Sequence, residues 1–106
     1  MTTTTLARPA SSVLPERFAV EITVDDIAQG EPGMANHCPI ALAVMRWMQN
    51  QGVAFKAVTI SSDDVLINLD WQTPSRPYWH DAFSFVSDFD YGLPVEPRTV
   101  VLARLP

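Results

Sequence analysis

Two stretches of the chain alternate between apolar and polar residues, and this pattern limits the fold more than any other feature of the sequence. In the first stretch, from Arg17 to Val24, the apolar positions are Phe18, Val20, Ile22 and Val24. In the second, they are Val65, Ile67, Leu69 and Trp71. A period of two is typical of a β-strand that buries one face and exposes the other. We therefore expect two strands of a half-covered sheet at these positions.

Proline and glycine indicate a helix between these strands. Pro39 suits the first position of a helix, where its missing N–H needs no partner, and Gly52 suits the left-handed residue that follows a helix. The sequence therefore predicts a helix from Pro39 to Gln51, preceded by a loop over 25–37 with one short helical turn at 25–28. After it, Val58 and Ile60 indicate a strand that a polar turn over 61–64 joins to the strand beginning at Val65.

The C-terminal third predicts one more helix and one more strand. A helix is expected from about Arg76 to Tyr91, and Gly92 and Pro94 end the pattern. The apolar side of its helical wheel holds Tyr78, Trp79, Ala82, Phe83, Phe85, Val86 and Phe89, and the polar side holds Arg76, His80, Ser84, Ser87, Asp88 and Tyr91. A last strand is expected from Arg98 to Arg104. The predicted order is β-α-β-β-α-β, so we expect an α+β fold of the ferredoxin-like sandwich type or a related two-layer fold, with a four-stranded antiparallel sheet and two helices.

Length and composition predict one domain. A chain of 106 residues is long enough for one hydrophobic core. Residues 1–16 are rich in Thr, Ser and Pro and predict a flexible N-terminal extension, with the α+β domain over 17–106. No signal segment, membrane span or disulfide pair is visible, which favours the cytoplasm. The net charge of −5 argues against nucleic-acid binding and favours a basic protein partner.

Cys38 is the residue with the most reactive chemistry. It lies just before Pro39, where the partial positive charge of a helix N-terminus lowers the pKa of a thiol and attracts anions. One interpretation is an anion or ligand site formed by Asn36, His37 and Cys38; the other is a small buried cysteine that closes the loop onto the helix. His37, Cys38 and His80 are too few for a zinc site and show no known catalytic spacing. We expect no enzyme activity, metal or cofactor.

Two surfaces are candidates for a protein partner. The predicted helix over 39–51 is apolar nearly all round, so Leu42, Met45 and Arg46 could contact the preceding loop, the N-terminal extension or another chain, including a second copy in a homodimer. The second surface is an acidic patch of Asp81, Asp88 and Asp90. Negative charge near the C-terminus of a helix is unfavourable, and locally unfavourable choices often mark functional sites.

Several short motifs resemble a known pattern. They are Ile27 and Gly30, the run Cys-Pro-Ile-Ala-Leu-Ala over 38–43, and the run Phe-Val-Ser-Asp-Phe-Asp-Tyr-Gly over 85–92 followed by Val95 and Pro97. Together they resemble short proteins of tailed phages and prophages, especially those of actinobacterial hosts. The resemblance spans about residues 20–102, excludes 72–78 and lacks the aromatic expected at Thr99. It implies a phage genetic context, an accessory role and a location in the cytoplasm of the host cell.

These observations leave three functional hypotheses. The first is a host-takeover or anti-defence protein that binds and inhibits a bacterial protein. The second is a protein that binds a small ligand, such as a signalling nucleotide, near Cys38. The third is a virion or assembly component that uses the N-terminal extension as a docking arm. All three are binding functions without catalysis.

Overall fold

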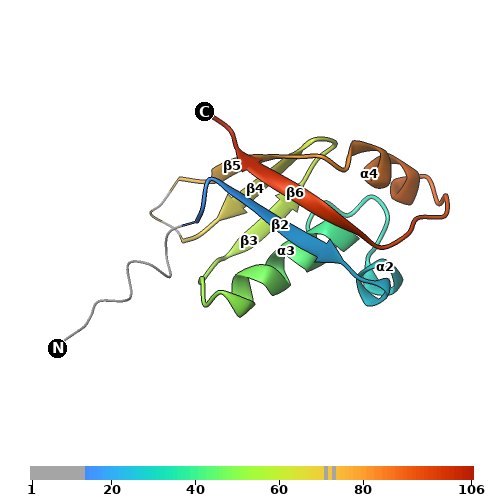
Figure 1. Ribbon diagram of the computed structural model, residues 1–106, viewed down its shortest axis with the longest axis horizontal. Helices are drawn as coiled ribbons and strands as arrows, with labels where there is room; N and C mark the ends of the chain where they lie inside the picture. The colour runs from blue at the N-terminus through green and yellow to red at the C-terminus, as the bar shows by residue number, and fades with distance from the viewer. Residues whose placement is uncertain (1–13, 71, 73) are drawn as a thin grey trace.

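A computed structural model describes residues 14–70, 72 and 74–106, and these form an α+β fold (Figure 1). The described residues contain five strands and three helices. In chain order they are β2 (Arg17–Ile22), α2 (Val24–Gln29), α3 (Pro39–Asn50), β3 (Ala57–Ile60), β4 (Asp64–Asn68), β5 (Arg76–His80), α4 (Phe83–Asp90) and β6 (Arg98–Arg104). The α+β class expected from the sequence is therefore confirmed.

The sheet is antiparallel throughout and has the strand order β2-β6-β5-β4-β3. The first strand, β2, pairs with the last, β6, with Val20 opposite Val100. Helix α3 packs against both edge strands, β2 and β3, so the sheet curls around this helix. In Figure 1, α2 and α4 lie together at one end of the molecule, and the start of β2 lies toward the other end.

The core lies between α3 and the concave face of the sheet. Alternate residues of every strand point toward the helix, as the burial of Phe18, Val20 and Ile22 on β2 illustrates. From α3, the buried side chains are Pro39, Ile40, Ala41, Ala43, Val44 and Met48. The buried residues of the other strands are Val58, Ile60, Val65, Ile67, Tyr78, His80, Val100 and Leu102.

Most of the predicted elements are present. Strand β2 ends at Ile22, two residues earlier than expected, because Thr23 caps the short helix α2 that begins at Val24. Helix α3 begins at Pro39 and ends at Asn50, and Gly52 follows with a φ of 73°. Strands β3 and β4 form the expected hairpin. Trp71, expected in the second of these strands, lies outside the described residues.

The prediction of one helix from Arg76 to Tyr91 is wrong. Residues Arg76–His80 form β5, which lies between β4 and β6, and only Phe83–Asp90 are helical. The expected four-stranded, ferredoxin-like sheet is accordingly replaced by a five-stranded one. The period in β5 is two, because Tyr78 and His80 are buried and Trp79 is exposed. The alternation is not apparent in the sequence, because the second buried position holds a polar residue, His80.

The chain is packed into the domain from Leu14 onward. Leu14 is buried, and the hydroxyl of the fully buried Tyr78 donates a hydrogen bond to the carbonyl of Pro15 at 2.6 Å. The amide of Arg104 donates to the carbonyl of Glu16 at 2.7 Å. Residues 1–13 of the expected extension lie outside the described residues, whereas residues 14–16 adjoin the sheet.

Candidate functional site

A surface pocket lies between α4, the loop that leads into α3, and the turn after β3. Its volume is about 320 Å³. We call it the α4 pocket, and it is lined by Gly33, Met34, Ala35, Cys38, Pro39, Ile40, Ile60, Ser61, Ser62, Phe83, Phe85, Val86, Ser87, Phe89, Asp90 and Tyr91. Helix α4 is thus one wall, and the N-terminal end of α3 is another.

Most residues that line the α4 pocket are apolar, although Ser61, Ser87 and Asp90 add polar groups, and large hydrophobic side chains are exposed around it. Ile40, Ile60 and Phe85 are buried in the core beneath it. Phe83 and Tyr91, at the two ends of α4, remain 58% and 81% exposed. Exposed aromatic side chains beside a pocket are characteristic of contact surfaces, because covering them with a partner removes apolar area from water.

Gly30 allows the loop to reach the pocket wall. A Cβ atom at this position would come within 2.6 Å of the Pro39 ring and 2.8 Å of its backbone nitrogen, so a larger residue would push the loop away from α3. Farther along, Gly33 has a φ of 76°, and its amide donates a hydrogen bond to Oδ1 of Asp90 at 3.0 Å. The loop is thereby attached to both α3 and α4.

Asp90 is the only charged residue that lines the pocket within the described part of the chain. It lies at the C-terminal end of α4, where the helix dipole adds negative potential. The sequence placed Asp90 in an acidic patch and Cys38 in a separate ligand site; the structure places both in the wall of one pocket.

Cys38 is a buried thiol, as the second interpretation of the sequence had it. Burial raises the pKa of Cys38 from its ordinary value; the amides of Ala41 and Ile40 oppose this rise, and the negative charge of Asp90 adds to it. The amides at the helix N-terminus thus act in the expected direction, but burial outweighs them and the net change in this pKa is upward. Of the proposed anion site, Asn36 is exposed, His37 is half-buried, and only Cys38 lines the pocket.

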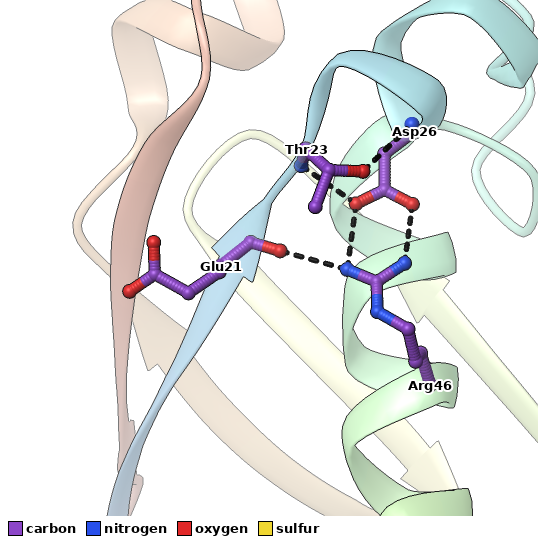
Figure 2. A network of polar contacts seen from close by, with 4 residues as sticks. All are labelled: Glu21, Thr23, Asp26 and Arg46. Atoms are coloured by element: carbon purple, nitrogen blue, oxygen red, sulfur yellow. Dashed lines mark hydrogen bonds and ion pairs between the residues drawn. The ribbon is translucent and has the colours of Figure 1, made fainter.

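The predicted surface on α3 is partly occupied within the chain. Helix α2 packs against α3, and Met45 is half-buried against the core, while Leu42 is also half-buried. Arg46 forms an ion pair with Asp26 of α2 and a hydrogen bond to the carbonyl of Glu21 on β2 (Figure 2). The sequence left three possible contacts for this side of α3: the preceding loop, the N-terminal extension and another chain. In the structure the preceding segment makes one of these contacts, because it contains α2.

The other two acidic residues do not line the pocket. Asp81 lies between β5 and α4, where its carboxylate accepts hydrogen bonds from the amide of Val101 at 3.0 Å and from Arg98 at 3.2 Å. Asp88 is half-buried on α4, outside the pocket lining. The structure therefore divides the predicted acidic patch: Asp81 is bonded to β6, and Asp90 to the loop at Gly33.

His80 is buried on β5 rather than exposed on the polar face of a helix, so that expectation is corrected. The amide of Ala82 donates to Nδ1 at 3.1 Å, which leaves Nε2 to donate to the carbonyl of Ser61 at 3.0 Å. Both ring nitrogens are thus engaged with backbone groups. His80 fixes the turn at Ser61 against the start of α4, and both segments line the pocket.

Among the pocket residues that the sequence did not identify as functional are the exposed side chains of Met34, Phe83 and Tyr91. Phe83 fell on the apolar side of the predicted helix and was expected in the core. For Tyr91 a signal was available, because this aromatic residue falls on the polar side of the predicted helix and was therefore expected to be exposed.

The described residues give no indication of a metal site or a transmembrane helix. Over 14–70, 72 and 74–106, no three His, Cys, Asp or Glu side chains are grouped closely enough to hold a metal ion. Within the same ranges, no helix has both the length and the apolar character needed to cross a bilayer.

Comparisons of the chain with protein-family models, curated proteins and solved structures found no significant match. The resemblance to phage and prophage proteins stays a prediction, and the function has to be argued from the α4 pocket itself.

Proposed function

We propose that this protein acts by binding, as an accessory protein of a tailed phage or prophage that attaches to a bacterial host protein and inhibits it. The observation that carries the proposal is the α4 pocket, which is lined mostly by apolar residues and includes the exposed aromatic side chains of Phe83 and Tyr91. Aromatic residues of this kind contribute a large part of the binding free energy in protein interfaces.

The negative charge of the chain favours a partner with a basic surface. The chain has a net charge of −5, and Asp90 brings negative charge to the pocket wall. An acidic surface attracts a basic partner over a distance of about 10 Å at moderate salt, which speeds association. The same charge disfavours an anionic ligand at the N-terminal end of α3.

Affinity capture from a host lysate tests the proposal. The full-length chain is immobilised, and bound proteins are identified by mass spectrometry at physiological salt. We expect one stoichiometric partner, which is lost with Phe83→Ser because the contact beside the pocket is removed. Leu66→Ser is the matched control, since Leu66 is also an exposed apolar residue, on β4 outside the pocket lining. Capture of the same partner by the Phe83 variant would show that the pocket is not the contact.

A small-ligand binder is the second candidate function. The pocket volume of about 320 Å³ lies at the lower end of the range of small-molecule sites, about 300 to 1,000 Å³. Asp90 favours a neutral or cationic compound over a signalling nucleotide. A thermal-shift panel that contains both kinds of ligand tests this candidate, because a ligand at about 100 times its Kd adds about 2.7 kcal/mol of stability.

A further inference from the structure

We infer that the α4 pocket binds the side chain of an arginine or lysine residue of its partner, with the aliphatic stem inside the pocket and the cationic head at Asp90. This inference rests on the proposed function and specifies which part of a partner is recognised. The side chains of arginine and lysine combine an apolar stem with a charged end, and they often bury the stem while the charge stays at the surface.

The distribution of polarity in the pocket matches such a side chain. Apolar side chains that keep accessible surface line the pocket, among them Met34, Val86 and Phe89, and these suit methylene groups. The only charged residue in the described lining is acidic, and no basic residue competes with an incoming cation there. A purely apolar side chain would gain nothing from the charge of Asp90, and an acidic one would be repelled.

The carboxylate of Asp90 is held in place but retains capacity to accept further hydrogen bonds. Oδ1 accepts one bond, from the amide of Gly33 at 3.0 Å, and no other bond to this carboxylate occurs among the described residues. A carboxylate can accept about four hydrogen bonds, so a guanidinium or ammonium group can still bind. The negative end of the α4 dipole lies at the same place and favours a cation further.

The aromatic side chains beside the pocket favour a cation as well. Phe83 and Tyr91 are both exposed and both line the pocket at the ends of α4. The face of an aromatic ring attracts the charged group of lysine or arginine when the two lie within about 6 Å. Charge, apolar contact and aromatic character thus all point to the same class of side chain.

NMR titration of the full-length chain with short peptides tests the inference. The probes are acetyl-Ala-Ala-X-Ala-Ala-amide peptides in which X is arginine, lysine, norleucine or glutamate. We expect the arginine and lysine peptides to shift the amide resonances of Phe83, Asp90 and Tyr91 and to bind about tenfold more tightly than the norleucine peptide. The glutamate peptide should cause no shifts at these residues.

The Asp90→Asn variant distinguishes the effect of the Asp90 charge on binding from its effect on the structure of the pocket. Asparagine keeps an oxygen that can accept the Gly33 bond, so the loop stays attached while the charge is removed. This variant should lose the tenfold preference and bind the lysine and norleucine peptides alike. Glu16→Gln is the control, because it removes one negative charge from an exposed residue that precedes β2 and lies outside the pocket lining, and it should keep the preference.

The outcomes distinguish this inference from the proposed function. Equal binding of the lysine and norleucine peptides by the unmodified chain, or no shifts at the pocket residues with any peptide, would overturn the inference. If Phe83→Ser still abolishes capture of the lysate partner in either case, the proposed function stands and only the recognised side chain is wrong. If Phe83→Ser keeps that partner while the basic peptides bind, the pocket recognises cationic side chains but is not the contact with the captured protein.

Discussion

The guanidinium of Arg46 on α3 forms two parallel hydrogen bonds with the carboxylate of Asp26 on α2, Nη1 to Oδ1 at 2.7 Å and Nη2 to Oδ2 at 2.8 Å. Nη2 also donates to the carbonyl of Glu21 on the edge strand β2 at 2.8 Å (Figure 2). One side chain therefore joins α2, α3 and β2. It also occupies a backbone acceptor at the sheet edge, where unpaired groups otherwise favour aggregation.

Replacing Arg46 should destabilise the fold. We expect Arg46→Met to lower the free energy of unfolding by about 1 to 2 kcal/mol, because the Asp26 side chain, only 5% exposed, loses its charged partner. The Arg46 side chain is 41% exposed, so the loss should stay below that of a fully buried ion pair. Urea denaturation measures the change. Arg17→Met, at an exposed position of β2, should stay within about 0.5 kcal/mol of the unmodified chain. Equal effects of the two substitutions would contradict the structural role of the pair.

The same pair predicts how stability depends on pH. Burial raises the pKa of the Asp26 carboxyl, but hydrogen bonds from Arg46 and Thr23 outweigh burial and hold this pKa below its ordinary value of 3.8. At pH values between the lowered pKa and the ordinary one, the unfolded chain therefore binds more protons at this carboxyl than the folded chain does. The stabilisation is present above the ordinary pKa and is lost as the pH falls through the lower, folded pKa. Unfolding free energies measured from pH 7 to pH 3 should fall less steeply for Asp26→Asn than for the unmodified chain. Parallel curves would count against a lowered pKa.

The sequence predicted the elements whose buried residues are all apolar. Strand β2 and helix α3 were found because alternation in one and the Pro39 and Gly52 boundaries in the other are local signals. Strand β5 was missed because His80 occupies one of its buried positions. A histidine that satisfies both ring nitrogens with backbone groups costs little to bury, but in a sequence it looks like a surface residue.

The candidate site was predicted only in fragments. Cys38 and Asp90 were each identified from the sequence, but nothing local indicates that residues 52 positions apart share one pocket. The connection depends on the loop at Gly33, whose amide binds Asp90, and on the position of α4 after the unpredicted strand β5. For Arg46 the error is the opposite one. The sequence suggested that this side chain is available to a partner, whereas in the structure it forms an ion pair with Asp26 of the same chain.

Substitution of His80 tests whether its two hydrogen bonds hold the pocket together. We expect His80→Leu to lower the free energy of unfolding by about 2 to 4 kcal/mol, because the Ala82 amide and the Ser61 carbonyl both lose their partner in a buried environment. His80→Asn should cost about half as much, since the amide oxygen can take the place of Nδ1 and accept the Ala82 bond. Chemical denaturation compares the two variants. If asparagine is as damaging as leucine, packing of the imidazole ring matters more than its hydrogen bonds.

Alkylation of Cys38 tests the electrostatics of the pocket. Burial raises the pKa of this thiol, and Asp90 adds to the rise, so the thiolate fraction at neutral pH is small and access to it is poor. We expect iodoacetamide to modify the folded chain at pH 7 at least about tenfold more slowly than the same chain in urea, where the burial is removed. Asp90→Asn should accelerate the reaction in the folded state, whereas Glu16→Gln should leave it unchanged. Rapid alkylation of the folded chain at neutral pH would mean that the helix N-terminus outweighs burial, and Cys38 would then be a candidate nucleophile facing the pocket.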